Sequence, residues 1–172
     1  MGELKEPRRT HPLPEGDPVI PVENEVVEEL VAAGWTVAIA ESLTGGTISA
    51  RLSSCPGTED RMLGGVVSYA TDAKRRVLDV DGDVVTSSAA VQMARAVRDL
   101  FAADVGLSLT GVAGPVRQED QPVGTVFVGW STPSGDGYRR LACAGAPEQI
   151  RRESADRALL LLRDALRAEG RR

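Results

Sequence analysis

The segment from Ala40 to Gly46, which reads AESLTGG, contains the residue types most able to do chemistry. It follows an apolar run, Trp35–Ala40, and precedes a helix-compatible run from about Thr44, which together predict a strand, a sharp turn and a helix. Ser42 lies at this turn, beside backbone N–H groups of a helix start that favour an anion or an oxyanion. Ser42 is therefore either a nucleophile or simply the N-cap of the helix. The segment does not match the Gly-x-Ser-x-Gly elbow of α/β-hydrolases.

A nucleophilic serine needs a base, and the chain has a single histidine, His11, in a proline-rich N-terminal stretch. Tyr69 and Lys74 offer another solution, because Tyr69 ends an expected strand and Lys74 lies in the first turn of the next helix. A lysine whose pKa is lowered by burial can act as a base, and a tyrosine can relay the proton or hydrogen-bond the intermediate. The alternative for Lys74 is a solvated position, since Lys-Arg-Arg is typical of an exposed helix face.

A third candidate is the glycine-rich turn from Thr110 to Pro115, at the carboxyl end of an apolar strand. Open α/β sheets place ligand sites there, and glycines let the backbone approach a ligand closely. A plain turn after a strand explains the same residues equally well. A polar stretch without periodicity, Gly114–Pro122, follows as a loop.

Composition restricts the classes of function. The 172 residues, 42% hydrophobic and 26% charged, predict one globular domain, and 3% aromatic content with a net charge of −5 argues against a nucleic-acid surface. No apolar run approaches the roughly 20 residues that span a bilayer. Two cysteines, Cys55 and Cys143, are too few for a metal cluster or a disulfide scaffold, so we expect a cytoplasmic protein without a metal site. Neither the phosphate-loop nor the dinucleotide motif is present.

The pattern of elements predicts an α/β fold, a three-layer α/β/α sandwich with a mixed sheet. We expect a disordered arm over residues 1–21 and a single domain over residues 22–170. The expected strands are Trp35–Ala40, Gly64–Ala70, Val105–Gly111, Val123–Trp130 and Tyr138–Ala144. The expected helices are one from about Val22 that stops at Gly34, Thr44–Ser54, Asp72–Leu78, one that is capped by Ser87 or Ser88 and carries Phe101, and Glu148–Ala168.

Several separated motifs in register resemble one known family, the CinA C-terminal domain or nicotinamide-nucleotide amidase (PncC-type) family. That family reads Ala-Glu-Ser-Cys-Thr-Gly-Gly, then Val-x-Tyr-x-x-x-x-Lys, then Gly-x-Ala-Gly-Pro followed by Lys-Pro-Val-Gly-Thr-Val. The matching segments here are Ala40–Gly46, Val67–Lys74, Gly111–Pro115 and Gln121–Val126. Order and spacing agree from about residue 22 to 168.

The resemblance implies an amidohydrolase of pyridine nucleotide metabolism and NAD recycling, which converts nicotinamide mononucleotide to nicotinate mononucleotide and ammonia. It implies Ser42 as the nucleophile, activated by Lys74 and Tyr69, and no metal or organic cofactor. It also implies a homo-oligomer as one option. Many members carry a second, N-terminal domain for which this chain lacks room, so the resemblance implies a stand-alone amidase. The residues expected to shape the substrate site are Thr44, Gly45, Gly46, Thr110, Gly111, Ala113 and Gly114.

Three segments depart from the family pattern. Leu43 replaces a cysteine, Val116-Arg117-Gln118 replaces a glycine-rich stretch, and Ala146 stands where an arginine is expected to meet the substrate. A phosphate would lose a bidentate contact at Ala146, which Arg117, Arg151 or Arg152 could replace. The departures leave two alternatives open: a catalytically weak nucleotide-binding or regulatory module, and an amidase with a shifted substrate. A DNA-processing partner, suggested by the family's competence-related name, finds little support in the charge pattern.

Overall fold

The computed structural model describes residues 21–169 of the chain. Apart from Pro21, the expected arm over residues 1–21, with His11, lies outside the described residues. The helices are α1 (Val22–Ala33), α2 (Thr47–Ser53), α3 (Thr71–Leu78), α4 (Ser87–Phe101) and α5 (Pro147–Glu169). The strands are β1 (Val37–Glu41), β2 (Met62–Val67), β3 (Val105–Gly111), β4 (Thr125–Thr132) and β5 (Gly135–Ala142).

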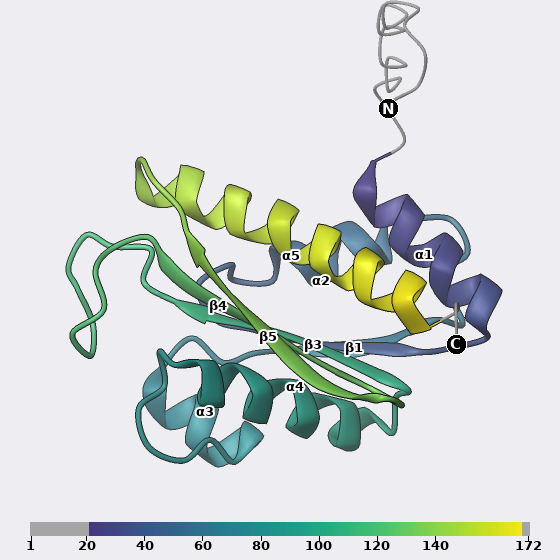
Figure 1. The fold of residues 1–172 in the computed structure, drawn as a ribbon, viewed down its shortest axis with the longest axis horizontal. Coiled ribbons are helices and arrows are strands. Elements are labelled where there is room, and N and C mark those ends of the chain that lie inside the picture. The colour runs from purple at the N-terminus through teal and green to yellow at the C-terminus, as the bar shows by residue number, and fades with distance from the viewer. Residues whose placement is uncertain (1–20, 170–172) are drawn as a thin grey trace, which may run out of the picture.

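The five strands form one mixed sheet with the order β2-β1-β3-β4-β5. Strand β1 pairs in parallel with β2 and β3, while β3, β4 and β5 pair antiparallel in sequence. Helices α1, α2 and α5 cover one face of the sheet, and α3 and α4 cover the other (Figure 1). The α/β/α sandwich predicted from the sequence is therefore confirmed.

Each face of the sheet buries its own hydrophobic core. The first core joins β1, β3 and β4 to α1, α2 and α5, and includes Ile39, Leu107 and Leu159 at 0% exposure. The second core lies between the sheet and α4. Helix α4 packs so closely on β3 that a Cβ added at Gly106 would lie 2.0 Å from the Ala94 carbonyl oxygen. The absence of a side chain at Gly106 thus sets the distance between this helix and β3.

The structure corrects two of the predicted helix starts. Helix α2 begins at Thr47 rather than Thr44, and its N-cap residue is Gly46, with φ of 99° and no side chain of its own to cap the helix. Helix α4 is capped by Thr86 rather than by a serine, since Thr86 Oγ1 accepts a hydrogen bond of 3.1 Å from the Ala89 N–H. The interpretation of Ser42 as an N-cap is therefore wrong, and Ser42 lies four residues before the true cap.

The strand boundaries also shift in two places that affect the site. Strand β1 continues through Glu41, so that Ser42 is the first residue after it. Strand β2 ends at Val67, two residues before Tyr69, so Tyr69 lies in the connection to α3 rather than at the end of the strand. The physical reason is pairing: Val67 is the last β2 residue with a partner on β1, and that partner is Glu41.

The sheet topology creates a place for a site at the carboxyl ends of β1 and β3. From β1 the chain crosses to β2 on one side, while β3 lies on the other side of β1. The connections that leave β1 and β3 therefore diverge, which opens a crevice above the carboxyl ends of the strands. Ser42 follows β1 and Gly111 ends β3, so both border this crevice.

Candidate active site

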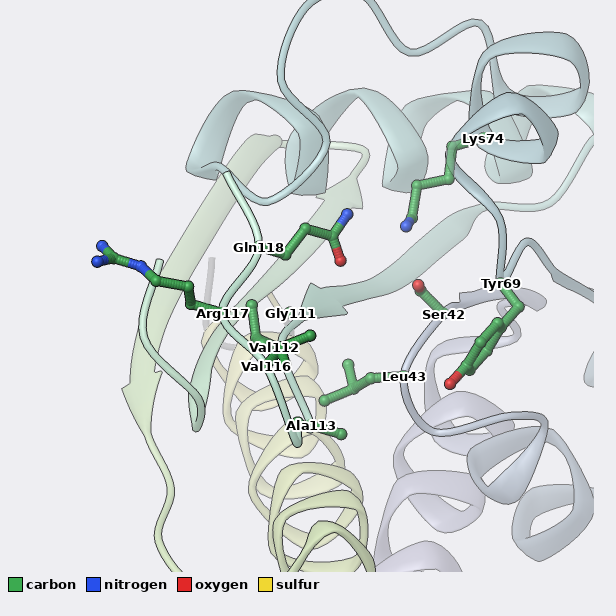
Figure 2. Close-up of a pocket in the computed structure, with 11 residues that line it drawn as sticks. Ser42, Leu43, Tyr69, Lys74, Gly111, Val112, Ala113, Val116, Arg117 and Gln118 are labelled. Atoms are coloured by element: carbon green, nitrogen blue, oxygen red, sulfur yellow. The ribbon is translucent and has the colours of Figure 1, made fainter. Parts of the chain in front are cut away.

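A cavity of about 240 Å³ lies at this point of the sheet (Figure 2). Its walls come from the turn after β1, the connection into α3, helix α3 and the loop after β3. The residues that line it are Ser42, Leu43, Tyr69, Lys74, Gly111, Val112, Ala113, Gly114, Val116, Arg117 and Gln118. The three segments that the sequence marked as candidates for chemistry therefore meet at one cavity.

Ser42 and Lys74 are the two buried polar side chains on its wall, each 3% exposed. The hydroxyl of Ser42 and the amine of Lys74 point toward the same space from opposite sides (Figure 2). Neither side chain forms a hydrogen bond with another described residue. Both groups are thus available to a molecule that enters the cavity.

Burial lowers the pKa of the Lys74 amine below its ordinary value, because the charged form loses its water shell. The negative charge of Glu119 acts in the opposite sense and raises the pKa of Lys74, but less than burial lowers it. Of the two interpretations that the sequence left open for Lys74, the structure therefore shows the buried one and not the solvated one suggested by the run Lys-Arg-Arg. A larger fraction of Lys74 is neutral at a given pH than of an ordinary lysine.

Glu41, the last residue of β1, fixes the turn that carries Ser42. Its side chain is 0% exposed, and its two carboxylate oxygens accept hydrogen bonds from the Ile48 N–H at 3.0 Å and the Ser49 N–H at 2.8 Å. The Ser49 hydroxyl donates a third bond at 2.7 Å. These N–H groups belong to the first turn of α2, so Glu41 caps that helix from the strand before it.

This capping corrects the expectation that the start of the helix offers its N–H groups to a ligand. The Ile48 and Ser49 N–H groups bind Glu41, and the Thr47 N–H binds the Thr44 carbonyl. The N–H groups of Leu43 and Thr44, within the turn itself, form no hydrogen bond with another described residue. Donors for an oxyanion therefore lie immediately after Ser42 rather than in the helix.

Tyr69 lines the cavity but does not complete a triad with Ser42 and Lys74. Its side chain is 63% exposed, and its hydroxyl points away from both groups (Figure 2). The structure thus brings together the first two predicted catalytic residues and leaves the third at the rim of the cavity.

The predicted substrate-site residues divide into two groups. Gly111, Ala113 and Gly114 line the cavity, as the glycine-rich turn after β3 predicts. Four others do not line it: Thr44, Gly45, Gly46 and Thr110.

Two hydroxyls among those four have a clear structural setting. Thr110, with 0% exposure, donates a 2.5 Å hydrogen bond to the Val84 carbonyl and so fixes the segment before α4. Thr44 is 3% exposed, and its Oγ1 is buried without a hydrogen-bond partner among residues 21–169. Thr110 thus acts within the fold rather than in the cavity.

The arginines near the site have different partners. Arg117 lines the cavity, but its guanidinium extends away from Ser42 and donates a 2.6 Å bond to the Asp120 carbonyl (Figure 2). Arg151, from α5, donates a 3.1 Å bond to the Leu43 carbonyl and so holds the Ser42 turn from behind. Ala146 is exposed at the start of α5 and does not line the cavity.

Sequence reasoning missed two acidic residues that shape the site, Glu41 and Glu119. Glu41 was part of the recognised motif, and its place directly before Ser42 at the end of an apolar strand was the available signal. Glu119 binds the Val85 N–H at 2.7 Å, a contact between residues 34 positions apart. A contact across that separation leaves no local pattern.

Two further features concern residues 21–169 as a whole. Within this range the structure contains no group of three or more His, Cys, Asp and Glu side chains placed to hold a metal ion. None of the helices described is both long and apolar enough to cross a membrane.

Comparison with known proteins identifies the family. The family model of the CinA C-terminal domain matches residues 20–166. A putative competence-damage inducible protein of Desulforamulus reducens is 39% identical over 154 residues, which are 86% of this chain and 38% of the relative. A CinA-like protein of Frankia casuarinae is 41% identical over 151 residues, or 84% of this chain and 35% of the relative. The chain thus spans little more than a third of the curated relatives it matches.

Solved structures agree with the sequence comparison over almost their whole length. The crystal structure of a CinA superfamily protein from Klebsiella pneumoniae 700603 superimposes with a TM-score of 0.82 at 29% identity, covering 86% of this chain and 96% of that one. A competence damage-inducible protein A from another Klebsiella pneumoniae strain gives a TM-score of 0.81 at 32% identity, covering 84% and 94%. With its family model, its relatives and its fold in agreement, this chain belongs to the CinA C-terminal domain family.

Proposed function

We propose that the cavity is the active site of a serine amidohydrolase that converts nicotinamide mononucleotide to nicotinate mononucleotide and ammonia. One observation carries the proposal: the Ser42 hydroxyl and the buried Lys74 amine face the same cavity from opposite sides (Figure 2). The substrate follows from the motifs shared with the nicotinamide-nucleotide amidases. The reaction class follows from the pairing of a hydroxyl with an amine of lowered pKa.

In the first step the neutral Lys74 amine takes the proton of the Ser42 hydroxyl while Oγ attacks the carboxamide carbon. The resulting tetrahedral intermediate collapses, the C–N bond breaks, and Lys74 returns the proton to the leaving ammonia. Water then attacks the acyl ester on Ser42 while Lys74 accepts a proton from it, and Lys74 returns that proton to Ser42 Oγ as the ester C–O bond breaks and nicotinate mononucleotide leaves. Lys74 must be neutral at the start, which its burial favours.

The oxyanion of the intermediate needs hydrogen-bond donors close to Ser42. The unpaired N–H groups of Leu43 and Thr44 supply them, and the residue after a nucleophile is a common source of such a donor. Glu41 holds the turn in register by binding the first turn of α2. The phosphate of the nucleotide meets Arg117, the arginine on the cavity wall within residues 21–169.

An ammonia-release assay tests the proposal, with nicotinamide mononucleotide and a panel of related amides as substrates. Ser42→Ala is expected to abolish release, and Lys74→Ala to reduce it nearly to background. Two exposed neighbours provide matched controls, Ser53→Ala on α2 and Arg76→Ala on α3, and both should retain full activity. Full activity in purified Ser42→Ala or Lys74→Ala would exclude this mechanism.

A second candidate is a nucleotide-binding or regulatory module on the same fold. It is favoured by the geometry of Tyr69, whose hydroxyl points away from Ser42 and Lys74, and by the absence of a hydrogen bond between those two side chains. Calorimetry with nicotinamide mononucleotide beside the ammonia assay separates the two functions. Binding without turnover supports the module, and turnover excludes it.

A further inference from the structure

We propose that Glu119 is a positioning residue of this site, which pins the loop after β3 over the cavity and places a negative charge that acts on the Lys74 amine. The inference deepens the proposed function and rests on it for the role of Lys74. It comes from three observations: an unusual turn, a long-range hydrogen bond and a charge that acts on the amine. No motif of the sequence marked Glu119.

The turn is a tight two-residue hairpin within the loop Gly114–Pro122. Gln118 and Gln121 pair by backbone hydrogen bonds of 3.2 Å and 2.8 Å, and the two residues between them, Glu119 and Asp120, have φ angles of 48° and 59°. Turns with two positive φ angles favour Gly, Asn and Asp, because the Cβ of other side chains is crowded in this conformation. A glutamate there must be held by other contacts, and such outliers cluster at functional sites.

The contact that holds it is the hydrogen bond from the Val85 N–H to the Glu119 carboxylate, at 2.7 Å. Val85 lies between α3, which carries Lys74, and α4. The preceding residue, Val84, is held through its carbonyl by the hydroxyl of Thr110. The same connection is therefore fixed on one side by β3 and on the other by the loop.

Pinning the turn also places a side chain over the cavity. Gln118, the first residue of the hairpin, lines the cavity, and its carboxamide extends toward the space between Ser42 and Lys74 (Figure 2). Arg117, one residue earlier, extends away from that space. Glu119 thus fixes which side chain of the loop faces the reacting groups.

Glu119 is also the acidic group whose charge acts on Lys74, favouring its ammonium form. The other titratable groups of the cavity wall, Tyr69 and Arg117, both point away from the amine (Figure 2). Helix α4, which packs against α3, has three charged side chains: Arg95 pairs with Asp136, Arg98 donates to Ser131, and Asp99 is exposed. On α3 itself, Asp72, Arg75 and Arg76 are exposed.

The test compares Glu119→Gln, Glu119→Ala and a matched control, Asp120→Asn, in the full chain. Asp120→Asn removes one negative charge from the same turn and leaves the Val85 bond intact. Lys5 and Lys74 are the only two lysines of the chain, so NMR of ¹³Cε-labelled lysine gives two signals, and Lys5→Arg assigns them. The titration of Lys74 is thereby measured without any turnover.

We expect the titration midpoint of Lys74 to fall in both Glu119 variants and to stay nearer the parent value in Asp120→Asn. Exchange of the Val85 amide should rise on the order of ten-fold in Glu119→Ala, because a hydrogen bond to a carboxylate is lost. Glu119→Gln keeps an acceptor oxygen, so the Val85 amide should exchange more slowly in this variant than in Glu119→Ala. If the parent enzyme is active, the acidic limb of its pH profile of kcat/KM should move to lower pH in the Glu119 variants, together with the titration midpoint of Lys74.

Two results would overturn the proposal. One is a Lys74 titration that moves equally in Glu119→Gln and Asp120→Asn, and the other is a Val85 amide that exchanges equally fast in Glu119→Ala and the parent. Loss of the proposed function gives a different pattern, in which the parent protein releases no ammonia while the Lys74 midpoint and the Val85 exchange still respond to Glu119. The two failures are therefore distinguishable.

Discussion

Replacing Glu41 tests how the Ser42 turn is held. Glu41→Gln keeps the volume of a side chain that is 0% exposed, but it turns one of two acceptor oxygens into an NH₂ group. The NH₂ group is itself a donor, and it then lies against another donor, either the Ile48 N–H or the N–H and hydroxyl of Ser49. Leaving a buried donor unpaired costs about 1–3 kcal/mol, and the lost interaction of the charge with the helix start adds about 0.3–1 kcal/mol. We expect a loss of about 2 kcal/mol in the free energy of unfolding.

Glu41→Ala removes all three hydrogen bonds. Losing the cap of α2 costs about 0.5–2 kcal/mol, and the unpaired Ser49 hydroxyl and the space left behind add to it. We therefore expect a loss of about 3 kcal/mol or more, larger than for Glu41→Gln. The difference between the two losses in the free energy of unfolding is as informative as their magnitudes. Glu41→Gln removes the charge and one acceptor oxygen, whereas Glu41→Ala also removes the volume of the side chain.

Urea unfolding followed by circular dichroism measures these changes. Glu59→Gln serves as the control, since Glu59 is exposed and should stay within about 0.5 kcal/mol of the parent. The ammonia assay is run on the same samples, since a turn displaced by about 1 Å can cost about 100-fold in rate. Unfolding of Glu41→Gln within about 0.5 kcal/mol of the parent would refute the view that this carboxylate fixes the turn.

Two further substitutions separate structural from chemical roles. Lys74→Met should raise the free energy of unfolding at neutral pH while abolishing activity, because burial, the larger influence on the Lys74 pKa, disfavours the ammonium form in the fold. In the parent protein the unfolded chain binds more protons than the folded one as the pH approaches 10.5, so the stability gained by Lys74→Met should shrink toward that pH. Urea unfolding at several pH values measures this gain, with the exposed Arg76→Met as control. Thr110→Val should cost about 1–3 kcal/mol of stability, because the buried Val84 carbonyl loses its donor, and should leave KM unchanged. A raised KM with unchanged stability would instead show Thr110 in the substrate site.

The layer arrangement could be predicted because helix and strand periodicities are local and strong. The alternation of strands and helices gave the sandwich, and the turn after β1 gave Ser42. What the local pattern could not decide is which oxygen caps α2. A serine before a helix is a common cap, but here the carboxylate of Glu41, seven residues before Ile48, reaches the N–H groups first. The strand must be in place before that contact exists.

The position of Tyr69 depends on strand pairing in the same way. Its sequence context continues the apolar run of β2, which predicts a residue at the strand end. Pairing with β1 stops at Val67, opposite Glu41, and the next residue, Ser68, still donates its N–H to the Glu41 carbonyl at 2.8 Å. The chain then leaves the sheet, and Tyr69 turns outward. A register of this kind depends on the neighbouring strand and is not encoded in the run itself.

Lys74 shows where a closer use of spacing would decide between two interpretations. The run Lys-Arg-Arg suggests a solvated face, yet Lys74 lies four residues before Leu78, which is 1% exposed, so both lie on the same face of α3. Arg75 and Arg76, one and two positions on, necessarily turn toward solvent. The four-residue spacing from Lys74 to Leu78 thus favours a buried Lys74 and two exposed neighbours. The charge that opposes its neutral form comes from Glu119, on a loop with no periodicity, and the chain must fold before the two can meet.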